Sequence, residues 1–229
     1  MNIWLTLDCI ICSLYSFLEK WQTLAAAMIA LYAAYNANKL IATQIRQTKD
    51  LEDKKIEGLH TAYRASFVLT LTKISRYCQE NSKNLKVLHK SISDVPNIKI
   101  AELPDTLDTA IERLISTSQN KNLTDLLASL IRNLQIFDSR MHSLKDDIAN
   151  ESMTKWWLET VIRQCVYIHS IYGLLMEYAR FEDENVPDHI DWSAYENSLR
   201  NLCYHENEFE DLFSEIGRLK LRGKVPDRY

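Results

Sequence analysis

The pattern of hydrophobic and polar positions divides the chain into two unlike parts. Residues 1–38 are almost entirely apolar, and their only charged side chains are Asp8, Glu19 and Lys20. Residues 39–229 instead show apolar positions at three- and four-residue spacing, which is typical of the buried face of an α-helix. The pattern predicts an all-α protein in which an apolar N-terminal segment precedes a helical bundle.

Residues 21–38 form a stretch without any charged side chain. As a helix, this stretch would be roughly 27 Å long, close to the hydrocarbon thickness of a bilayer. A soluble helix of that length normally carries a polar stripe, and this one has almost none before Asn36. We predict a transmembrane helix here, and the alternative is a helix buried in a protein core.

The preceding apolar stretch, residues 3–18, contains one acid and is marginal in length for a span. It either crosses the membrane as a short first span or lies at the interface. A signal peptide is disfavoured because no basic residues precede the stretch and an acid interrupts it. The prediction for residues 1–38 is a membrane-inserted hairpin that turns at Glu19–Lys20, with a single span as the alternative. Trp4 and Trp21 would then lie at opposite membrane boundaries, where tryptophan is enriched.

Charges after the second apolar stretch predict the orientation of this segment. Lys39, Arg46 and Lys49 follow it, whereas the expected turn offers only Lys20. Because positive charge is enriched on the cytoplasmic side of membrane proteins, the bulk of the chain is expected in the cytoplasm. These three cations would anchor that side.

Two features of the hairpin are candidates for function. Small side chains form a surface on which helices can approach closely in lipid, and this surface contains Ala26, Ala27, Ala30 and Ala34. It serves either packing within the hairpin or self-association into an oligomer. Asp8 is the second feature, because a carboxylate in an apolar segment is costly. It either lies near the interface or belongs to a polar pathway.

The remainder is expected to consist of a helical stalk, residues 39–58, and a bundle of four to six helices, residues 59–229. The stalk contains no proline, and its first glycine is Gly58. The helices expected in the bundle cover residues 59–92, 104–117, 123–149, 152–182 and a last segment that runs to about residue 221. Ser193 and Glu196 have the spacing of a capping box for that last helix.

Composition and motifs disfavour an enzyme. The 229 residues include only 4 Gly and 4 Pro, too few for folds built on many tight turns, and the formal net charge is −4. There is no glycine-rich phosphate loop, and no two of the 6 His lie three or four residues apart. An odd number of Cys, 5, does not suggest a secreted disulfide scaffold. We therefore predict a non-enzymatic protein without a metal or cofactor.

One charged cluster is a candidate binding surface. It lies near the C-terminus and contains Arg218, Lys220, Arg222 and Lys224. Such a cluster binds the phosphates of nucleic acid or lipid, or it simply complements the dipole at a helix C-terminus. The sequence leaves these alternatives open.

Residues 17–55, FLEKWQTLAAAMIALYAAYNANKLIATQIRQTKDLEDKK, resemble a recurring class of small bacterial membrane proteins of prophage-like or defence loci. The whole chain, with two apolar segments before a helical domain, resembles the transmembrane effectors of bacterial anti-phage retrons. The resemblance implies an effector of the bacterial inner membrane that a reverse transcriptase with its non-coding RNA and multicopy single-stranded DNA holds inactive. Release would disrupt the membrane and stop the host cell, which is abortive infection. A non-toxic membrane-anchored scaffold or signalling adaptor and a phage-exclusion protein are the alternatives.

Overall fold

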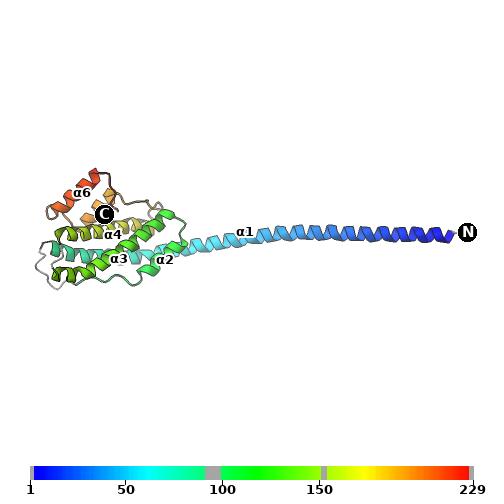
Figure 1. The fold of residues 1–229 in the computed structure, drawn as a ribbon, viewed down its shortest axis with the longest axis horizontal. Coiled ribbons are helices and arrows are strands. Elements are labelled where there is room, and N and C mark those ends of the chain that lie inside the picture. Colours follow the sequence, from blue (N-terminus) through cyan, green and yellow to red (C-terminus); the bar gives the residue numbers. More distant parts are fainter. Residues whose placement is uncertain (1–2, 91–98, 151–153, 227–229) are drawn as a thin grey trace. The chain divides into compact units, whose positions relative to one another are not determined.

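The computed structural model describes residues 3–90, 99–150 and 154–226; the side chains of residues 3–12, Lys145 and Ala149 are outside this description. Within these ranges the chain is helical and contains no strand, which confirms the predicted all-α class. The helices are α1 (Ile3–Lys90), α2 (Leu107–Thr117), α3 (Lys121–Ala149), α4 (Lys155–Ala179), α5 (Trp192–Asn201) and α6 (Glu210–Leu221) (Figure 1).

The chain divides into two compact units, Met1–Ile56 and Glu57–Tyr229. The described part of the first unit is the N-terminal part of α1. The second unit, called the bundle below, contains the rest of α1 together with α2–α6.

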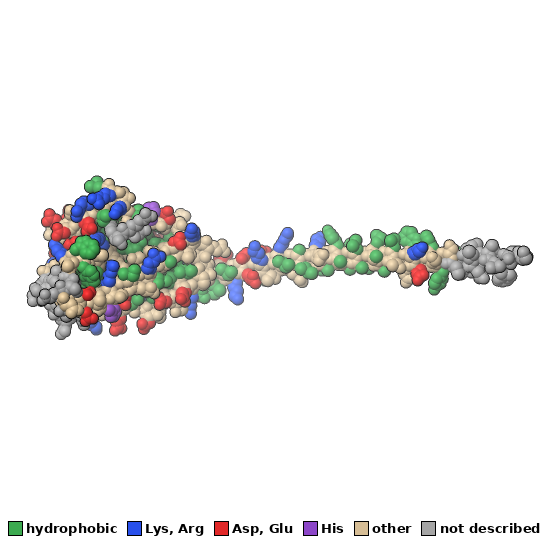
Figure 2. All heavy atoms as spheres, in the orientation of Figure 1, with side chains coloured by type: hydrophobic (Ala, Val, Ile, Leu, Met, Phe, Trp, Pro, Cys, Tyr) green, Lys and Arg blue, Asp and Glu red, His purple; other side chains and the backbone are tan. Residues whose placement is uncertain are grey.

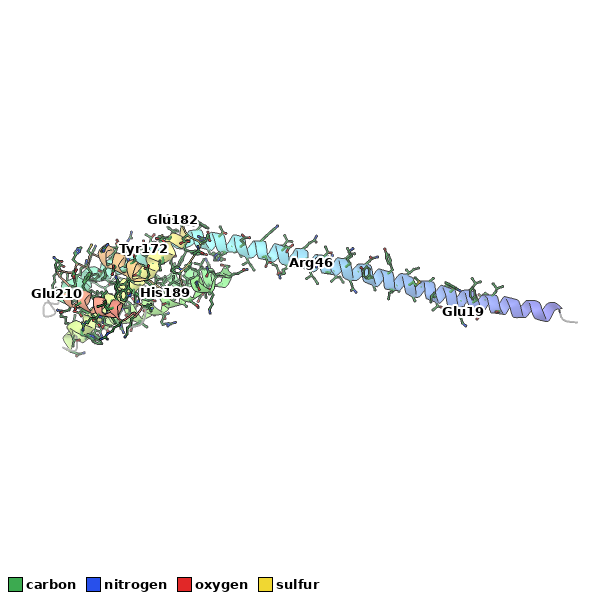
Figure 3. The ribbon with its side chains drawn as sticks, turned by 90° about the horizontal axis from the view of Figure 1, so that it is seen from above. Glu19, Arg46, Tyr172, Glu182, His189 and Glu210 are labelled. Atoms are coloured by element: carbon green, nitrogen blue, oxygen red, sulfur yellow. The ribbon has the colours of Figure 1, made fainter. Side chains whose placement is uncertain are left out.

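The predicted turn at Glu19–Lys20 is absent, because α1 continues through both residues (Figure 3). The hydroxyl of Thr23 donates to the carbonyl oxygen of Glu19 over 3.0 Å, a hydrogen bond of one helical turn across the expected break. The physical reason is that no Gly or Pro occurs before Gly58, and Glu and Lys are themselves good helix formers. The hairpin prediction is therefore corrected to a single continuous helix.

The apolar side chains of the first unit are exposed (Figure 2). The exposed fractions of its large hydrophobic side chains between Leu14 and Tyr35 range from 53% to 75%. No helix in the described part of the chain combines the length and apolar character needed to cross a membrane. Polar Gln22, Asn36 and Asn38 lower the hydropathy of the stretch that carries no charge.

The bundle has one hydrophobic core that runs through all its helices. The apolar positions of α1 at three- and four-residue spacing share one buried face, since Phe67, Leu71, Ile74 and Cys78 are fully buried and Tyr63 is half-buried. Helix α3 has a similar face, half-buried at Ile131 and buried at Leu126, Leu127, Leu130, Leu134 and Phe137. Helix α4 packs against α3 and α5, and most of its residues are buried.

Two helix boundaries in the bundle differ from the sequence prediction. Helix α2 begins at Leu107 rather than at Pro104, whose carbonyl instead accepts a hydrogen bond from the Leu107 amide over 3.1 Å. The expected last helix is in fact two helices, α5 and α6. Its N-cap is Asp191, which accepts from the Ala194 amide over 2.7 Å, rather than Ser193.

The break between α5 and α6 has a packing reason. Cys203 adopts a left-handed φ of 57° directly after the C-cap of α5. This turn lets the connecting segment place two aromatic side chains, Tyr204 and Phe209, in the core, where each is 1% exposed. Their rings lie 5.0 Å apart in an edge-to-face arrangement. A continuous helix would direct at least part of this segment away from the core.

Candidate functional site

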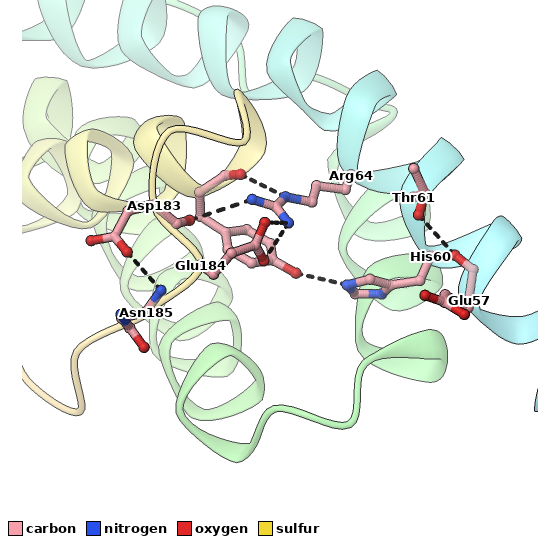
Figure 4. A network of polar contacts seen from close by, with 8 residues as sticks. Glu57, His60, Thr61, Arg64, Asp183, Glu184 and Asn185 are labelled. Atoms are coloured by element: carbon pink, nitrogen blue, oxygen red, sulfur yellow. Dashed lines mark hydrogen bonds and ion pairs between the residues drawn. The ribbon is translucent and has the colours of Figure 1, made fainter.

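A polar cluster surrounds Arg64, which lies on α1 in the bundle and is only 4% exposed (Figure 4). Its Nε donates to the carbonyl oxygen of Tyr178 over 2.6 Å. Its Nη1 donates to both carboxylate oxygens of Glu184, at 2.8 and 2.7 Å. Its Nη2 lies 3.4 Å from the carbonyl oxygen of Asp183. The guanidinium therefore ties α1 to the C-terminus of α4 and to the segment that follows it.

Two aromatic rings enclose the same guanidinium. Its central carbon lies 3.9 Å from the ring centroid of Tyr178 and 4.0 Å from that of Phe181. A planar cation on an aromatic face gains from the ring quadrupole, and more so where water is excluded. We call Arg64, Tyr178, Phe181 and Glu184 the Arg64 clamp.

The end of α4 is built to present the clamp. The amide of Glu182 donates to the carbonyl of Glu177 and the amide of Phe181 to that of Tyr178, each over 3.0 Å. This is the Schellman pattern of helix termination, in which glycine usually occupies the left-handed position. Here Phe181 occupies it, with φ 62°. A bulky residue in this conformation is strained, and its contact with Arg64 offsets part of that strain.

His60 connects the clamp to a third helix. Its Nε2 lies 2.7 Å from the hydroxyl oxygen of Tyr178, and its Nδ1 lies 3.0 Å from Oγ1 of Thr117, the last residue of α2. Burial, followed by the nearby Arg64 charge, lowers the pKa of His60 below its ordinary value. The imidazole is therefore neutral at pH 7, and α1, α2 and α4 are joined through it.

The clamp is suited to mechanical coupling rather than to covalent chemistry. It contains no serine or cysteine nucleophile, and burial raises the pKa of the Tyr178 hydroxyl, so that this group stays protonated. The guanidinium is already bound by a carboxylate and two backbone carbonyls. What the arrangement can do is hold α1 in a defined position against α4 and α2.

A second polar pair lies between α4 and α5. Nδ1 of His169 is 3.2 Å from the hydroxyl oxygen of Ser198, beside a pocket of about 210 Å³. Burial lowers the pKa of His169 to about 4, so the imidazole is neutral at pH 7. A neutral imidazole beside a hydroxyl fixes the two helices together. Its low pKa makes it a weak proton acceptor for activating that hydroxyl.

The buried thiols of Cys78 and Cys165 lie next to each other in the core, and Sγ of Cys165 is 3.6 Å from the carbonyl oxygen of Cys78. A hydrogen bond between the thiols, followed by burial, holds the pKa of Cys78 well above its ordinary value. A thiol rather than a thiolate is a poor nucleophile. Among the residues described, no three His, Cys, Asp or Glu side chains form a group that could hold a metal ion.

The residues predicted from the apolar segment lie on one helix. Trp4 and Asp8 belong to α1, but their side chains lie outside the described part of the structure. The described residues further along the segment, and the cations expected to follow it, are exposed: Trp21, Ala26, Ala27, Ala30, Ala34, Lys39, Arg46 and Lys49.

The four predicted cations near the C-terminus lie close together at the end of α6, but they are not equivalent. Nζ of Lys220 is 2.6 Å from a carboxylate oxygen of Glu196, so its charge is paired. Within the described residues, no carboxylate pairs with Arg218, Arg222 or Lys224. The candidate surface is therefore reduced to these three.

The Arg64 clamp is not among the sites predicted from the sequence, although the sequence contains one signal of it. His60 and Arg64 continue the apolar stripe of α1, because positions 60, 64, 67, 71, 74 and 78 keep alternating spacings of four and three. A cation at a core position must have a buried partner. The residues that bind Arg64 could not be predicted from this spacing, since they come together with it only in the tertiary fold.

Comparison with known proteins identifies no relative. No protein-family model, no curated protein and no solved structure matches this chain. A function for this chain must therefore be argued from its own residues and from the resemblances of residues 17–55 and of the whole chain.

Proposed function

We propose that this chain is a non-enzymatic, membrane-directed effector of bacterial anti-phage defence. Its N-terminal helix enters the inner membrane and disrupts it, while the bundle restrains this activity. The observation that carries the proposal is the exposure of large apolar side chains along α1 from Leu14 to Tyr35. A helix that exposes so many large apolar side chains needs lipid or a protein surface to cover them.

The energy available from burying this helix is large. Fully burying one large apolar side chain stabilises by about 1.5–3 kcal/mol. Between Leu14 and Tyr35 the large hydrophobic side chains are Leu14, Tyr15, Phe17, Leu18, Trp21, Leu24, Met28, Ile29, Leu31, Tyr32 and Tyr35, all more than half exposed. Burying them together is worth on the order of 10–20 kcal/mol. This energy supports transfer of the helix into lipid, and the charges of Glu19 and Lys20 oppose that transfer.

The helix has two different faces, which suggests how copies associate in lipid. Rotation by about 100° per residue places large side chains on one face: Phe17, Trp21, Leu24, Met28, Leu31 and Tyr35. The same rotation places Ala26, Ala30 and Ala34 on the opposite face. Small residues four apart let membrane helices approach closely. We propose that these alanines join helices into an oligomer while the large side chains face the acyl chains.

The restraint on this helix is proposed to come from a partner of the bundle. The resemblance of the whole chain to the transmembrane effectors of retrons supports a reverse transcriptase with its non-coding RNA and multicopy single-stranded DNA as that partner. The Arg64 clamp and His60 are the elements through which binding at the bundle would act on α1, because the clamp fixes α1 to α4 and His60 joins α1 to α2. Release of the partner frees the helix to enter and disrupt the membrane.

Expression of the full chain in a bacterium, with a voltage-sensitive dye and growth measured together, tests the proposal. The wild-type chain should depolarise the membrane and arrest growth. Leu31→Lys should abolish both effects, because it places a charge in the apolar helix. Leu69→Lys is the matched control, since Leu69 lies in the bundle and is 71% exposed, against 75% for Leu31. This variant should behave as wild type.

The same assay separates the alternatives. An intact potential and normal growth, with the wild-type chain recovered in the membrane fraction, would contradict an effector and favour an anchored scaffold or adaptor. Protection against phage without growth arrest would favour phage exclusion. Equal effects of the two lysine variants would contradict the role of the N-terminal helix. Suppression of toxicity by co-expressed reverse transcriptase and its RNA would support the proposed partner.

A further inference from the structure

The end of α6 carries an exposed leucine within a group of cations. Leu221 is 90% exposed, more than any other exposed large hydrophobic residue in the described part of the chain. Arg218 and Arg222 flank it at the i−3 and i+1 positions, and Lys224 follows two residues later. Figure 2 shows basic side chains gathered at this edge of the bundle, with a hydrophobic side chain among them.

The backbone holds this group in a defined geometry. The amides of Gly223 and Lys224 donate to the carbonyls of Lys220 and Leu219 over 3.1 and 3.2 Å, and Gly223 has φ 65°, which completes a Schellman end for α6. The indole of Trp192 donates to the carbonyl of Lys224 over 3.0 Å, which ties the turn to α5. The leucine and its cations are therefore presented by an ordered turn rather than by a free tail.

The charges in this group are available to a partner. The charge of Lys220 is not among them, because it is paired with the carboxylate of Glu196. Arg218 and Arg222 lie one helical turn apart on one face of α6, and both are exposed. With Lys224, they give three unpaired cations around one apolar side chain among the residues described.

We propose that Leu221, Arg218, Arg222 and Lys224 form a docking point for an anionic phospholipid surface. The cations bind headgroup phosphates, and Leu221 inserts between the headgroups into the acyl boundary. Cations near an anionic bilayer are attracted at about 1 kcal/mol each, and an apolar side chain adds its own transfer energy. This docking concerns the bundle and does not depend on whether the N-terminal helix enters lipid.

The exposed leucine distinguishes this partner from a nucleic acid. Single strands are bound by cations interleaved with aromatic platforms on which bases stack. In the described end of α6 the side chain among the cations is instead the aliphatic Leu221. The indole of Trp192 already donates a hydrogen bond to the carbonyl oxygen of Lys224. A protruding aliphatic residue gains nothing against phosphates alone, whereas it gains energy in the acyl region of a bilayer.

The test places an environment-sensitive fluorophore at the tip of the full-length chain. The variant is Leu221→Cys, labelled with a nitrobenzoxadiazole probe, with Cys9, Cys12 and Cys203 replaced by Ser. Vesicles of phosphatidylglycerol and phosphatidylcholine should shift the probe emission to shorter wavelength and raise its intensity. Vesicles of phosphatidylcholine alone should give a much weaker change. A probe on Cys203, with Leu221 retained, is the site control and should not respond.

Charge variants decide whether the cations carry the docking. Arg218→Gln combined with Arg222→Gln should raise the lipid concentration at half-maximal signal about 30-fold, as expected for the loss of two headgroup contacts. Lys220→Gln is the matched control, and its already paired charge should change this concentration less than about twofold. Equal signals with both kinds of vesicle, or equal effects of these variants, would overturn the proposal. A response to a single-stranded RNA oligonucleotide but not to anionic vesicles would also overturn it.

Discussion

Replacing Arg64 by lysine tests whether the Arg64 clamp fixes α1 in the bundle. Lysine keeps the positive charge but loses the planar fork and the Nε–H donor. The charge-assisted hydrogen bond from Nε to the Tyr178 carbonyl, over 2.6 Å, is worth about 1.5–3 kcal/mol. Stacking on two rings at 3.9 and 4.0 Å is worth about 0.5–1 kcal/mol for each ring. Because lysine retains part of these interactions, we expect Arg64→Lys to lower the free energy of unfolding by about 2–3 kcal/mol.

Glu184→Gln provides the matched comparison within the same cluster. The carboxylate of Glu184 accepts two hydrogen bonds from Arg64, but its side chain is 71% exposed. An ion pair with one such exposed partner contributes about 0–1 kcal/mol. Urea unfolding of the full chain, followed by near-ultraviolet circular dichroism at constant m value, measures both changes. A stability of Arg64→Lys within about 0.5 kcal/mol of wild type, or a larger loss for Glu184→Gln, would show that Arg64 does not fix α1 in this way.

Phe181 has φ 62°, so Phe181→Ala should lower the free energy of unfolding by about 1 kcal/mol more than Phe181→Gly, because Ala retains the left-handed strain. Urea unfolding measures this difference. Cys203→Gly should raise the free energy of unfolding, because Cys203 also has a left-handed φ that glycine adopts without strain. The pKa of His169 is about 4 in the folded chain against about 6.5 in the unfolded chain. The contribution of the neutral imidazole to the free energy of unfolding is therefore fully present above pH 6.5 and is lost as pH falls toward 4. The loss is on the order of 3 kcal/mol, and unfolding curves at pH 7 and 4.5 should show that it is absent from His169→Gln. Spin labels at positions 14 and 28 should be about 21 Å apart along a continuous helix. A distance near 10 Å, measured by electron paramagnetic resonance, would instead indicate that the helix folds back as a hairpin.

The sequence predicted the bundle well where one periodic signal determined the structure. The stripes of α1 and α3 are buried because apolar side chains at helical spacing can share a core only on one face. The predicted hairpin is wrong because neither Glu19 nor Lys20 interrupts a helix, so that no turn forms there. The division of the last helix at Cys203 had no sequence signal of the usual kind, since glycine does not occupy the left-handed position.

The candidate site was predictable only in part. Arg64 lies on a stripe that the sequence shows, so its burial could have been inferred. Its partners could not, because Tyr178 and Glu184 lie more than 110 positions further along the chain. The structure also separates four similar cations near the C-terminus by pairing Lys220 with Glu196 across two helices. Pairing of this kind depends on how α5 and α6 pack and leaves no local pattern.

The accessibility of single cysteines in bacterial membranes tests the proposed residence of the N-terminal part of α1 in lipid. In chains with Cys9, Cys12 and Cys203 replaced by Ser, the cysteine of Leu31→Cys and that of Lys49→Cys are each treated with a membrane-impermeant maleimide in inverted vesicles. Position 49 should be labelled at once, whereas position 31 should be labelled only after detergent dissolves the membrane. Rapid labelling at both positions in intact vesicles would show that the helix lies outside the bilayer.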